Sequence, residues 1–278
     1  MLKPYLYFTT YGSMRVRTTS AILDAVTKIT RVTRAKPFKL RGSNLPICKS
    51  DHALSLWTEN APPIERLSLI NVVSFAVGEA VHRAWQTWLG DEGLIYGNWA
   101  CPRCGRIDIG YQRQCPTCYA HRNYHEIAYS EPFGMKVDAP IKSFYSDRVD
   151  QVWEFKTAGQ DKWQEKTRAD ESHILQVQCY GEKLRNDGWP IKTVAVVYLN
   201  RNSPWQPKAF AYKPVKVLDK ITASFEESRD AAQKGRIPDH EPPTDDACTW
   251  CKWKWYCYAP SRNRIFKKLS REYLSRTR

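Results

Sequence analysis

Apolar positions along the chain fall into a few periodic runs. Over residues 64–89 they recur at spacings of three and four, which predicts an amphipathic helix. The expected buried stripe of this helix consists of Ile64, Leu67, Ile70, Val73, Val77, Val81 and Trp85. Residues 135–141 and 149–157 are short β-like runs on either side of a polar connection, so they predict a hairpin. Residues 193–199 are almost wholly apolar, which predicts a buried central strand.

The segments between these runs complete the expected fold. Residues 124–130 and 208–212 predict further strands, and residues 171–185 and 215–234 predict helices. Strands that alternate with helices indicate an α/β core with a mixed central sheet flanked by helices. We expect this core over residues 51–247, with an insertion at 99–125, a basic segment at 1–50 and a cysteine-containing basic tail at 248–278.

Positive charge is concentrated at the two ends of the chain. The formal net charge is +14, and residues 1–50 hold 10 Lys and Arg against one acidic residue. Residues 248–278 hold 9 against one. Such ends suit a polyanionic partner such as DNA, and a solvated basic face without a ligand is the alternative.

Two absent sequence features and the number of cysteines indicate the expected cellular compartment. No secretory signal and no apolar run long enough to span a membrane are present, so we expect a cytoplasmic protein without a membrane partner. Nine cysteines in such a protein favour metal ligation over disulfides.

Two pairs of cysteines within residues 99–125 have the spacing of metal knuckles. Each pair is separated by two residues, and Pro and Gly supply the tight turns. Four thiolates satisfy tetrahedral Zn²⁺, so we expect a structural zinc ribbon, with residues 107–111 as one strand of a small hairpin. Its expected ligands are Cys101, Cys104, Cys115 and Cys118, with His121 and His125 as alternatives. Its role is open: the ribbon contacts DNA, contacts a partner or braces a loop.

A second cysteine set lies near the end of the chain. Cys248, Cys251 and Cys257 follow a C-x2-C-x5-C pattern, which leaves a four-ligand site one residue short. Cys48 lies in an irregular segment that contains proline, whereas Cys179 lies within a predicted helix. Cys48 is therefore the better candidate for the fourth ligand. Spacing alone does not separate zinc from an iron–sulfur cluster at this site.

The predicted hairpin brings acidic side chains together. Pairing of its strands places Asp138 beside Glu154, and the period of two puts Lys156 on the same face as Glu154 and Phe155 on the other. Paired carboxylates suit Mg²⁺ or Mn²⁺, and a nearby lysine stabilises developing negative charge. Glu131 could add a further carboxylate. The alternative is a surface hairpin that carries a Glu–Lys pair.

Asp138 followed by Glu154-Phe155-Lys156 resembles the core motif of the PD-(D/E)XK nucleases. Three further patterns match the RecB-type branch of that superfamily: Gly-x-x-x-His at 78–82, Gly-x-x-x-Asp at 134–138 and Gln-x-x-x-Tyr at 176–180. One cysteine before these motifs and a C-x2-C-x5-C pattern after them resemble the iron–sulfur branch, which includes AddB, the CRISPR-adaptation nucleases and phage relatives. The resemblance covers residues 45–258, and the zinc-ribbon insertion departs from it.

The resemblance implies a restriction-endonuclease-like fold and a set of site residues. Mg²⁺ or Mn²⁺ would be held by Asp138, Glu154, the backbone carbonyl of Phe155 and His82. Lys156 would stabilise the transition state, and Gln176 and Tyr180 would orient the strand. A [4Fe–4S] cluster would be held by Cys48, Cys248, Cys251 and Cys257.

The expected function is that of a metal-dependent deoxyribonuclease. The family favours exonucleases that act on DNA ends or single strands in recombination and repair, and this preference is carried over by analogy. Because no phosphate-binding loop is present, we expect a stand-alone nuclease rather than a helicase fusion. The polar segment after residue 157 is expected to contact DNA through Lys162, Trp163, Lys166 and Arg168. The alternatives are a nuclease subunit of CRISPR adaptation and a non-catalytic nucleic-acid-binding protein.

Overall fold

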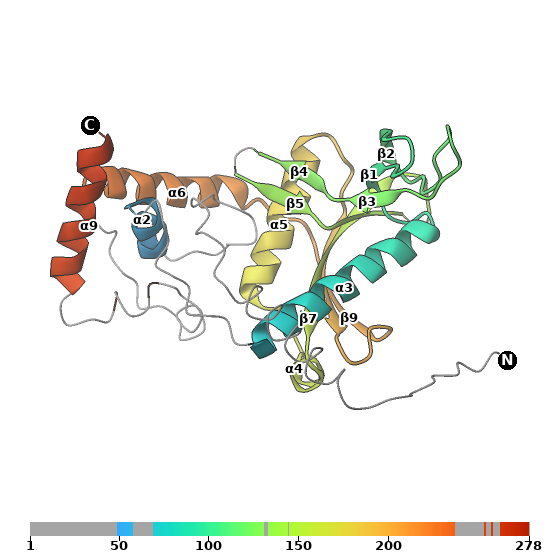
Figure 1. Cartoon of the computed structure of the whole chain (residues 1–278), viewed down its shortest axis with the longest axis horizontal. Coiled ribbons are helices and arrows are strands. Elements are labelled where there is room, and N and C mark those ends of the chain that lie inside the picture. The colour runs from blue at the N-terminus through green and yellow to red at the C-terminus, as the bar shows by residue number, and fades with distance from the viewer. Residues whose placement is uncertain are drawn as a thin grey trace, which may run out of the picture.

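The computed structural model describes residues 49–57, 69–130, 133–143, 145–236, 253, 257 and 262–277 (Figure 1). The helices in this part of the chain are α2 (Lys49–Trp57), α3 (Leu69–Asp91), α4 (Gln160–Glu165), α5 (Glu171–Asn186), α6 (Leu218–Gln233) and α9 (Arg262–Thr277). The strands are β1 (Gly97–Ala100), β2 (Ile107–Gly110), β3 (Asn123–His125), β4 (Ile127–Tyr129), β5 (Met135–Val137), β6 (Ala139–Lys142), β7 (Val149–Ala158), β8 (Thr193–Asn200) and β9 (Pro207–Tyr212).

A four-stranded mixed sheet forms the centre of the molecule. Its strand order is β6-β7-β8-β9, in which β7 and β8 are parallel and the two outer pairs are antiparallel. Every residue of β8 after Thr193 is buried, as its apolar sequence predicts. The predicted hairpin of β6 and β7 and the predicted strand β9 are also present. The expected mixed α/β architecture is therefore confirmed.

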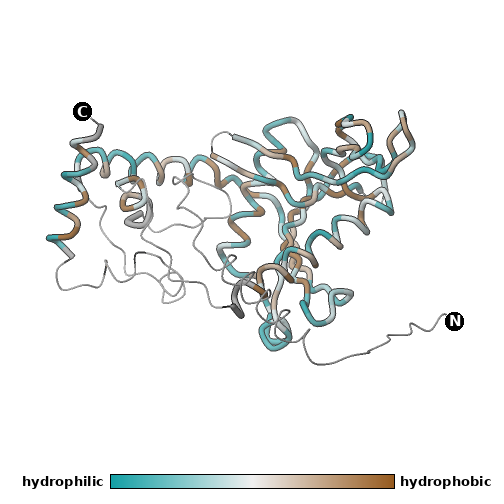
Figure 2. Tube along the Cα trace, viewed as in Figure 1, coloured by the Kyte–Doolittle hydropathy of each residue, from teal (hydrophilic) through white to brown (hydrophobic). Residues whose placement is uncertain are grey.

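Helices α3 and α5 cover opposite faces of this sheet. Along β8, Val194 and Val196 lie in one apolar cluster, to which α5 contributes Val177 and Leu184. The alternate residues of β8, such as Val197, lie in a second cluster with Val81 and Leu89 of α3. Figure 2 shows hydrophobic positions concentrated where the central strands cross the molecule.

The buried face of α3 differs from the predicted stripe. Val73 and Val77 are 51% and 40% exposed, so the sequence prediction was wrong at these positions. Ile64 and Leu67 lie outside the described residues. The helix instead turns Gly78 towards the sheet, where an added Cβ would come within 2.6 Å of the Thr157 hydroxyl. This close approach of helix and strand explains a glycine within the helix and rotates the buried face away from the two valines.

Two strands that the sequence predicts as continuous are broken by acidic residues. The run 124–130 divides into β3 and β4 at Glu126, and the run 135–141 divides into β5 and β6 at Asp138. The physical reason is a change of sheet at each break. Strand β3 pairs with β1, which also pairs with β2, whereas β4 pairs with β5 and β6 joins the central sheet. Both acidic residues thus lie at junctions between sheets.

A small helical group lies beyond the central sheet. Helix α6 extends from the core to α2 and α9, and α2 contacts both of them (Figure 1). The indole N–H of Trp57 donates a hydrogen bond to the Ala232 carbonyl at 2.9 Å, and that of Trp253 donates to the Ser55 hydroxyl at 3.2 Å. Segments from the two ends of the chain therefore pack together. None of the helices in the described ranges is both long and apolar enough to cross a membrane.

Candidate metal centres

The four cysteines of the insertion converge on one point. The sulfur atoms of Cys101 and Cys118 are 3.4 Å apart, those of Cys104 and Cys115 are 3.6 Å apart, and all four lie within 4.8 Å of one another. A tetrahedron with Zn–S bonds of about 2.3 Å places its sulfurs about 3.8 Å apart. The arrangement therefore fits a metal ion such as zinc. The described residues that converge here are the four cysteines, whereas His121 and His125 are exposed outside the group.

The two halves of this site have the same backbone design. The Cys101 carbonyl accepts a hydrogen bond from the amide of Gly105, and the Cys115 carbonyl accepts one from the amide of Tyr119. In each half the cysteine amide donates to the carbonyl five residues later, at 2.8 and 2.9 Å. The two pairs thus form matching knuckles, and β1 and β2 form the predicted hairpin around the first of them.

Backbone amides and a buried arginine favour thiolates at this site. Hydrogen bonds from backbone amides, first that of Cys104, lower the pKa of Cys101. Burial alone would raise the pKa of Cys115, but the amides of Cys118 and Thr117 bring it down to about 6. The guanidinium of Arg122 is almost completely buried between Asp108 and Cys115. The amide of Ala120 lowers the pKa of Cys118, but burial and hydrogen bonds to the other three cysteines raise it to about 11, so this thiol keeps its proton until a metal displaces it. Thiolates are the form that binds zinc, and the lowered pKa values of Cys101 and Cys115 suit a metal.

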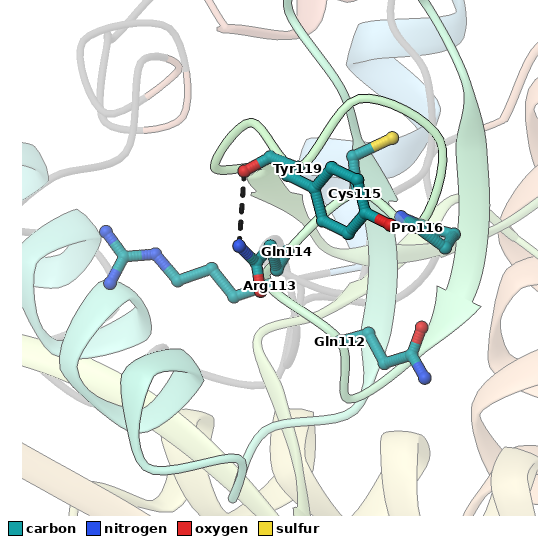
Figure 3. Close-up of a pocket in the computed structure, with 6 residues that line it drawn as sticks. All are labelled: Gln112, Arg113, Gln114, Cys115, Pro116 and Tyr119. Atoms are coloured by element: carbon teal, nitrogen blue, oxygen red, sulfur yellow. Dashed lines mark hydrogen bonds between the residues drawn. The ribbon is translucent and has the colours of Figure 1, made fainter.

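A shallow pocket with a cavity volume of about 400 Å³ lies beside the second knuckle (Figure 3). Its lining residues are Gln112, Arg113, Gln114, Cys115, Pro116 and Tyr119. The Gln114 side-chain amide donates a hydrogen bond to the Tyr119 carbonyl across it, at 3.3 Å. This pocket belongs to the ribbon and is separate from the carboxylates described next.

Asp138 and Glu154 meet as the hairpin prediction requires. Ala139 pairs with Trp153 in the antiparallel register. Asp138, the residue before Ala139, therefore lies opposite Glu154, the residue after Trp153. Asp138 Oδ2 accepts a hydrogen bond of 3.0 Å from the Phe155 amide, which fixes its carboxylate against β7. Both residues are buried, at 7% and 2% exposure.

The pKa values of these carboxyl groups reflect their burial. Burial, with Glu126 nearby, raises the pKa of Asp138 to about 7. Burial and the neighbouring Asp138 raise the pKa of Glu154 well above its ordinary range. Glu154 Oε2 has no hydrogen-bond partner in the described structure. The raised pKa values and the side-chain hydrogen bond between Asp138 and Glu154 favour a proton shared by the two carboxyl groups when no metal is bound, and a cation that displaces this proton would satisfy the oxygen.

Lys156 links the carboxylates to helix α5. Its ammonium lies 2.6 Å from Glu154 Oε1 and donates a hydrogen bond of 2.9 Å to Gln176 Oε1. The Gln176 amide nitrogen in turn donates to the Tyr180 hydroxyl at 2.6 Å. Gln176 and Tyr180 are both buried. The Gln-x-x-x-Tyr residues thus face the site and hold the lysine in place.

His82 and Glu126 complete the acidic cluster. His82 Nε2 lies 3.5 Å from Asp138 Oδ2 and 3.9 Å from Glu126 Oε1. Burial lowers the pKa of His82, which favours the neutral imidazole that a metal requires. Its Nε2 atom is buried without a hydrogen bond. One nitrogen and several carboxylate oxygens form a donor set that fits Mg²⁺ or Mn²⁺.

Sequence reasoning missed Glu126. The only feature of the sequence that could have pointed to Glu126 is a single carboxylate between two short β-forming runs. In the structure, the chain passes from one sheet to another at this residue. The expected contribution from Glu131 lies outside the described residues. The carbonyl of Phe155 stays a prediction as a ligand; its ring packs against His82 at a centroid distance of 5.4 Å.

The residues expected to contact DNA lie on and after α4. Lys162 and Arg168 are exposed. Trp163 is half-buried and donates a hydrogen bond to the Tyr198 carbonyl at 3.2 Å, with the Lys208 ammonium 4.4 Å from its ring centre. Lys166 forms an ion pair with Asp170. Trp163 and Lys166 are thus engaged within the protein, which leaves Lys162 and Arg168 as the better placed of the four.

The terminal cysteine set is described only in part. Cys48, Cys248 and Cys251 lie outside the described residues, whereas Cys257 packs against the cluster of α2, α6 and Trp253. Cys179, the other candidate, is buried in the main core, and burial raises the pKa of its thiol to about 12. A thiol in that environment is poorly suited to ligation.

Comparison with known proteins assigns no family. No protein-family model matches the chain. No curated protein matches it either. Among solved structures, the crystal structure of SSO0001 overlays with a TM-score of 0.44 and 12% sequence identity, covering 88% of this chain and 97% of the other.

Proposed function

We propose that this chain is a divalent-metal-dependent DNA nuclease with a PD-(D/E)XK active site. The observation that carries the proposal is the environment of Glu154. Its carboxylate is buried beside Asp138, one oxygen contacts the Lys156 ammonium at 2.6 Å, and the other oxygen has no hydrogen bond in the described structure. A buried acidic oxygen with no partner is costly in a purely structural hairpin.

Each side chain has a distinct role in this proposal. Asp138 and Glu154 would hold Mg²⁺ or Mn²⁺, with His82 as a further ligand. When bound, such a cation lowers the pKa of a coordinated water and polarises a phosphodiester. Lys156 would stabilise the negative charge that builds on the phosphate, and its bond to Gln176 keeps the ammonium in position. DNA is proposed as the substrate because the chain's excess positive charge lies at its two ends.

We also propose an iron–sulfur cluster held by Cys48, Cys248, Cys251 and Cys257. Support comes from the helical group at the chain ends. Helix α2 begins directly after Cys48, and Trp253, between the second and third of the other cysteines, donates a hydrogen bond to Ser55 of α2. Cluster binding would then tie the two ends together. Metal analysis and a visible absorption spectrum of protein purified without air distinguish iron from zinc.

The test of nuclease activity uses labelled single-stranded and duplex DNA with Mg²⁺ or Mn²⁺. Asp138→Asn, Glu154→Gln and Lys156→Met should each abolish cleavage while DNA binding, followed by fluorescence anisotropy, persists. Because the three residues act as a unit, double variants should lose no more than single ones. Glu92→Gln, at an exposed site in the turn after α3, is the control. Cleavage by Glu154→Gln at the wild-type rate contradicts the assignment and favours a non-catalytic binding protein.

A further inference from the structure

The zinc ribbon and the carboxylate site share part of the chain. Strand β3 is the last strand of the ribbon sheet, and Glu126 follows it directly, before β4 begins. The ribbon therefore does not project from the core on a linker. Its final strand ends within the acidic cluster.

Hydrogen bonds from the ribbon hold this junction in place. The Asn98 side chain on β1 donates to the Glu126 carbonyl at 3.2 Å. The Tyr124 hydroxyl on β3 donates to the Asp138 carbonyl at 2.9 Å. Tyr124 packs edge-to-face on Trp99, with ring centres 5.4 Å apart. The ribbon thus contacts the backbone of two acidic residues of the site.

The Glu126 carboxylate is oriented towards His82 and Asp138. The Gln86 side-chain amide, buried on α3, donates to Glu126 Oε1 at 3.3 Å and to the Asp138 carbonyl at 3.1 Å. One ligand atom from each of His82, Glu126 and Asp138 lies within 4.8 Å of the other two. Ligands of an octahedral cation with bonds of about 2.1 Å are separated by roughly 3 to 4 Å. Glu154, with its unpartnered buried oxygen, adjoins this group without belonging to it.

We propose that Glu126 is a metal ligand supplied by the zinc ribbon, so that His82, Glu126 and Asp138 form a divalent-cation site whose geometry depends on zinc. This inference rests on the proposed function, because Asp138 and His82 are ligands both in the site with Glu154 and in this one. The imidazole in the donor set favours Mn²⁺ over Mg²⁺. The ribbon accordingly acts as a structural support of the active site.

Equilibrium dialysis against Mn²⁺, with metal counting by mass spectrometry, tests the ligand directly. Glu126→Gln keeps the acceptor for Gln86 but removes the charge. It should raise the free Mn²⁺ concentration needed for half-saturation by about tenfold or more while the zinc content stays unchanged. Glu92→Gln should bind Mn²⁺ like the wild type. Asp138→Asn should bind Mn²⁺ more weakly than the wild type and Glu92→Gln. Wild-type Mn²⁺ binding by Glu126→Gln, with weakened binding by Asp138→Asn, would overturn the proposal.

Two further variants test the role of zinc. Cys104→Ser should lose zinc and also weaken Mn²⁺ binding, although none of the described cysteines belongs to the carboxylate site. Tyr124→Phe should keep zinc and weaken Mn²⁺ binding by a smaller factor, because it removes one hydrogen bond to Asp138. A zinc-free Cys104→Ser that binds Mn²⁺ normally would refute the dependence on the ribbon. DNA cleavage is scored separately: a chain that needs Glu126 for Mn²⁺ yet cuts no DNA refutes the proposed function alone.

Discussion

Tyr119 occupies in the second cysteine knuckle the backbone position that Gly105 occupies in the first. Their φ angles are 58° and 72°, and each amide donates to the carbonyl of the first cysteine of its pair. Left-handed backbone costs a non-glycine residue about 1–2 kcal/mol. Tyr119→Gly should therefore strengthen zinc binding severalfold, measured by competition with a chromophoric chelator.

The reciprocal change at the first knuckle serves as its control. An added Cβ at Gly105 meets no atom within 4 Å, so the cost of Gly105→Ala arises from the backbone alone. This variant should bind zinc more weakly. Equal zinc affinity for Gly105→Ala and the wild type would show that the left-handed backbone conformation does not affect zinc affinity at the knuckle.

Stability should depend on pH through Asp138. The pKa of its carboxyl rises from an ordinary 3.8 to about 7 in the folded chain. Between these values the folded chain keeps a proton that the unfolded chain has released. The free energy of unfolding therefore falls as pH rises through this window and is lowest above about pH 7 when no divalent cation is added. Asp138→Asn should lack this component, which thermal unfolding at several pH values measures.

Metal binding should show the opposite pH trend. Ligation requires the carboxylate form, so Mn²⁺ affinity should rise as pH increases towards and past about 7, with proton release on binding. Calorimetry in buffers of different ionisation enthalpy counts these protons. Proton-free binding at pH 6 would contradict the raised pKa of the site.

Gln176 should affect turnover more than binding. Its side chain bonds to both Lys156 and Tyr180, at 2.9 and 2.6 Å, so it positions the lysine. For the proposed nuclease, Gln176→Met should lower kcat about 10- to 100-fold, as expected when a supporting hydrogen-bond partner is removed. KM for DNA should change little. Tyr180→Phe, which removes only the outer bond, should have a smaller effect.

Glu182 should stabilise the start of helix α6. Its buried carboxylate accepts hydrogen bonds from the amides of Val217 and Leu218, the second at 2.7 Å. Glu182→Ala leaves both amides unpaired, which should lower the free energy of unfolding by about 1–3 kcal/mol. Glu226→Ala, at an exposed position of the same helix, is the control and should be nearly neutral. Chemical denaturation measures both.

The basic residues of α9 should contribute to DNA affinity through charge alone. Phe266 and Leu269 pack against the α2 cluster, so deletion of the helix would disturb the fold as well. A variant that keeps the helix avoids this disturbance of the fold. It replaces four exposed basic residues with Gln, namely Arg264, Lys267, Lys268 and Arg271. The slope of log Kd against log salt should fall by about 0.7 to 0.9 for each phosphate that the protein no longer neutralises. An unchanged slope would mean that α9 faces away from DNA.

The parts of the fold that local patterns determine were predictable. The period of two placed Glu154 and Lys156 on one face of β7, and the apolar run of β8 marked the central strand. The cysteine spacing identified the four cysteines that converge, because knuckle geometry depends on a few consecutive residues.

The parts that depend on distant contacts were not predictable. Val73 and Val77 have helical spacing, but the orientation of α3 is set by the approach of Gly78 to Thr157. Glu126 belongs to no local motif, and its role depends on where β3 and β4 separate into different sheets. Sequence periodicity contains no information on either relationship.

The single parallel strand pair of the central sheet has a consequence for how the chain folds. The β6–β7 and β8–β9 hairpins close over short connections, whereas β7 and β8 are joined by residues 159–192, which include α4 and α5. Closing this longer loop carries the larger entropic cost, so we expect it to occur late. Because α5 carries Gln176, the same event brings the glutamine to Lys156. During refolding, hairpin structure should therefore return first, and the complete site should form only when the crossover docks, which stopped-flow circular dichroism and Mn²⁺ binding can time separately.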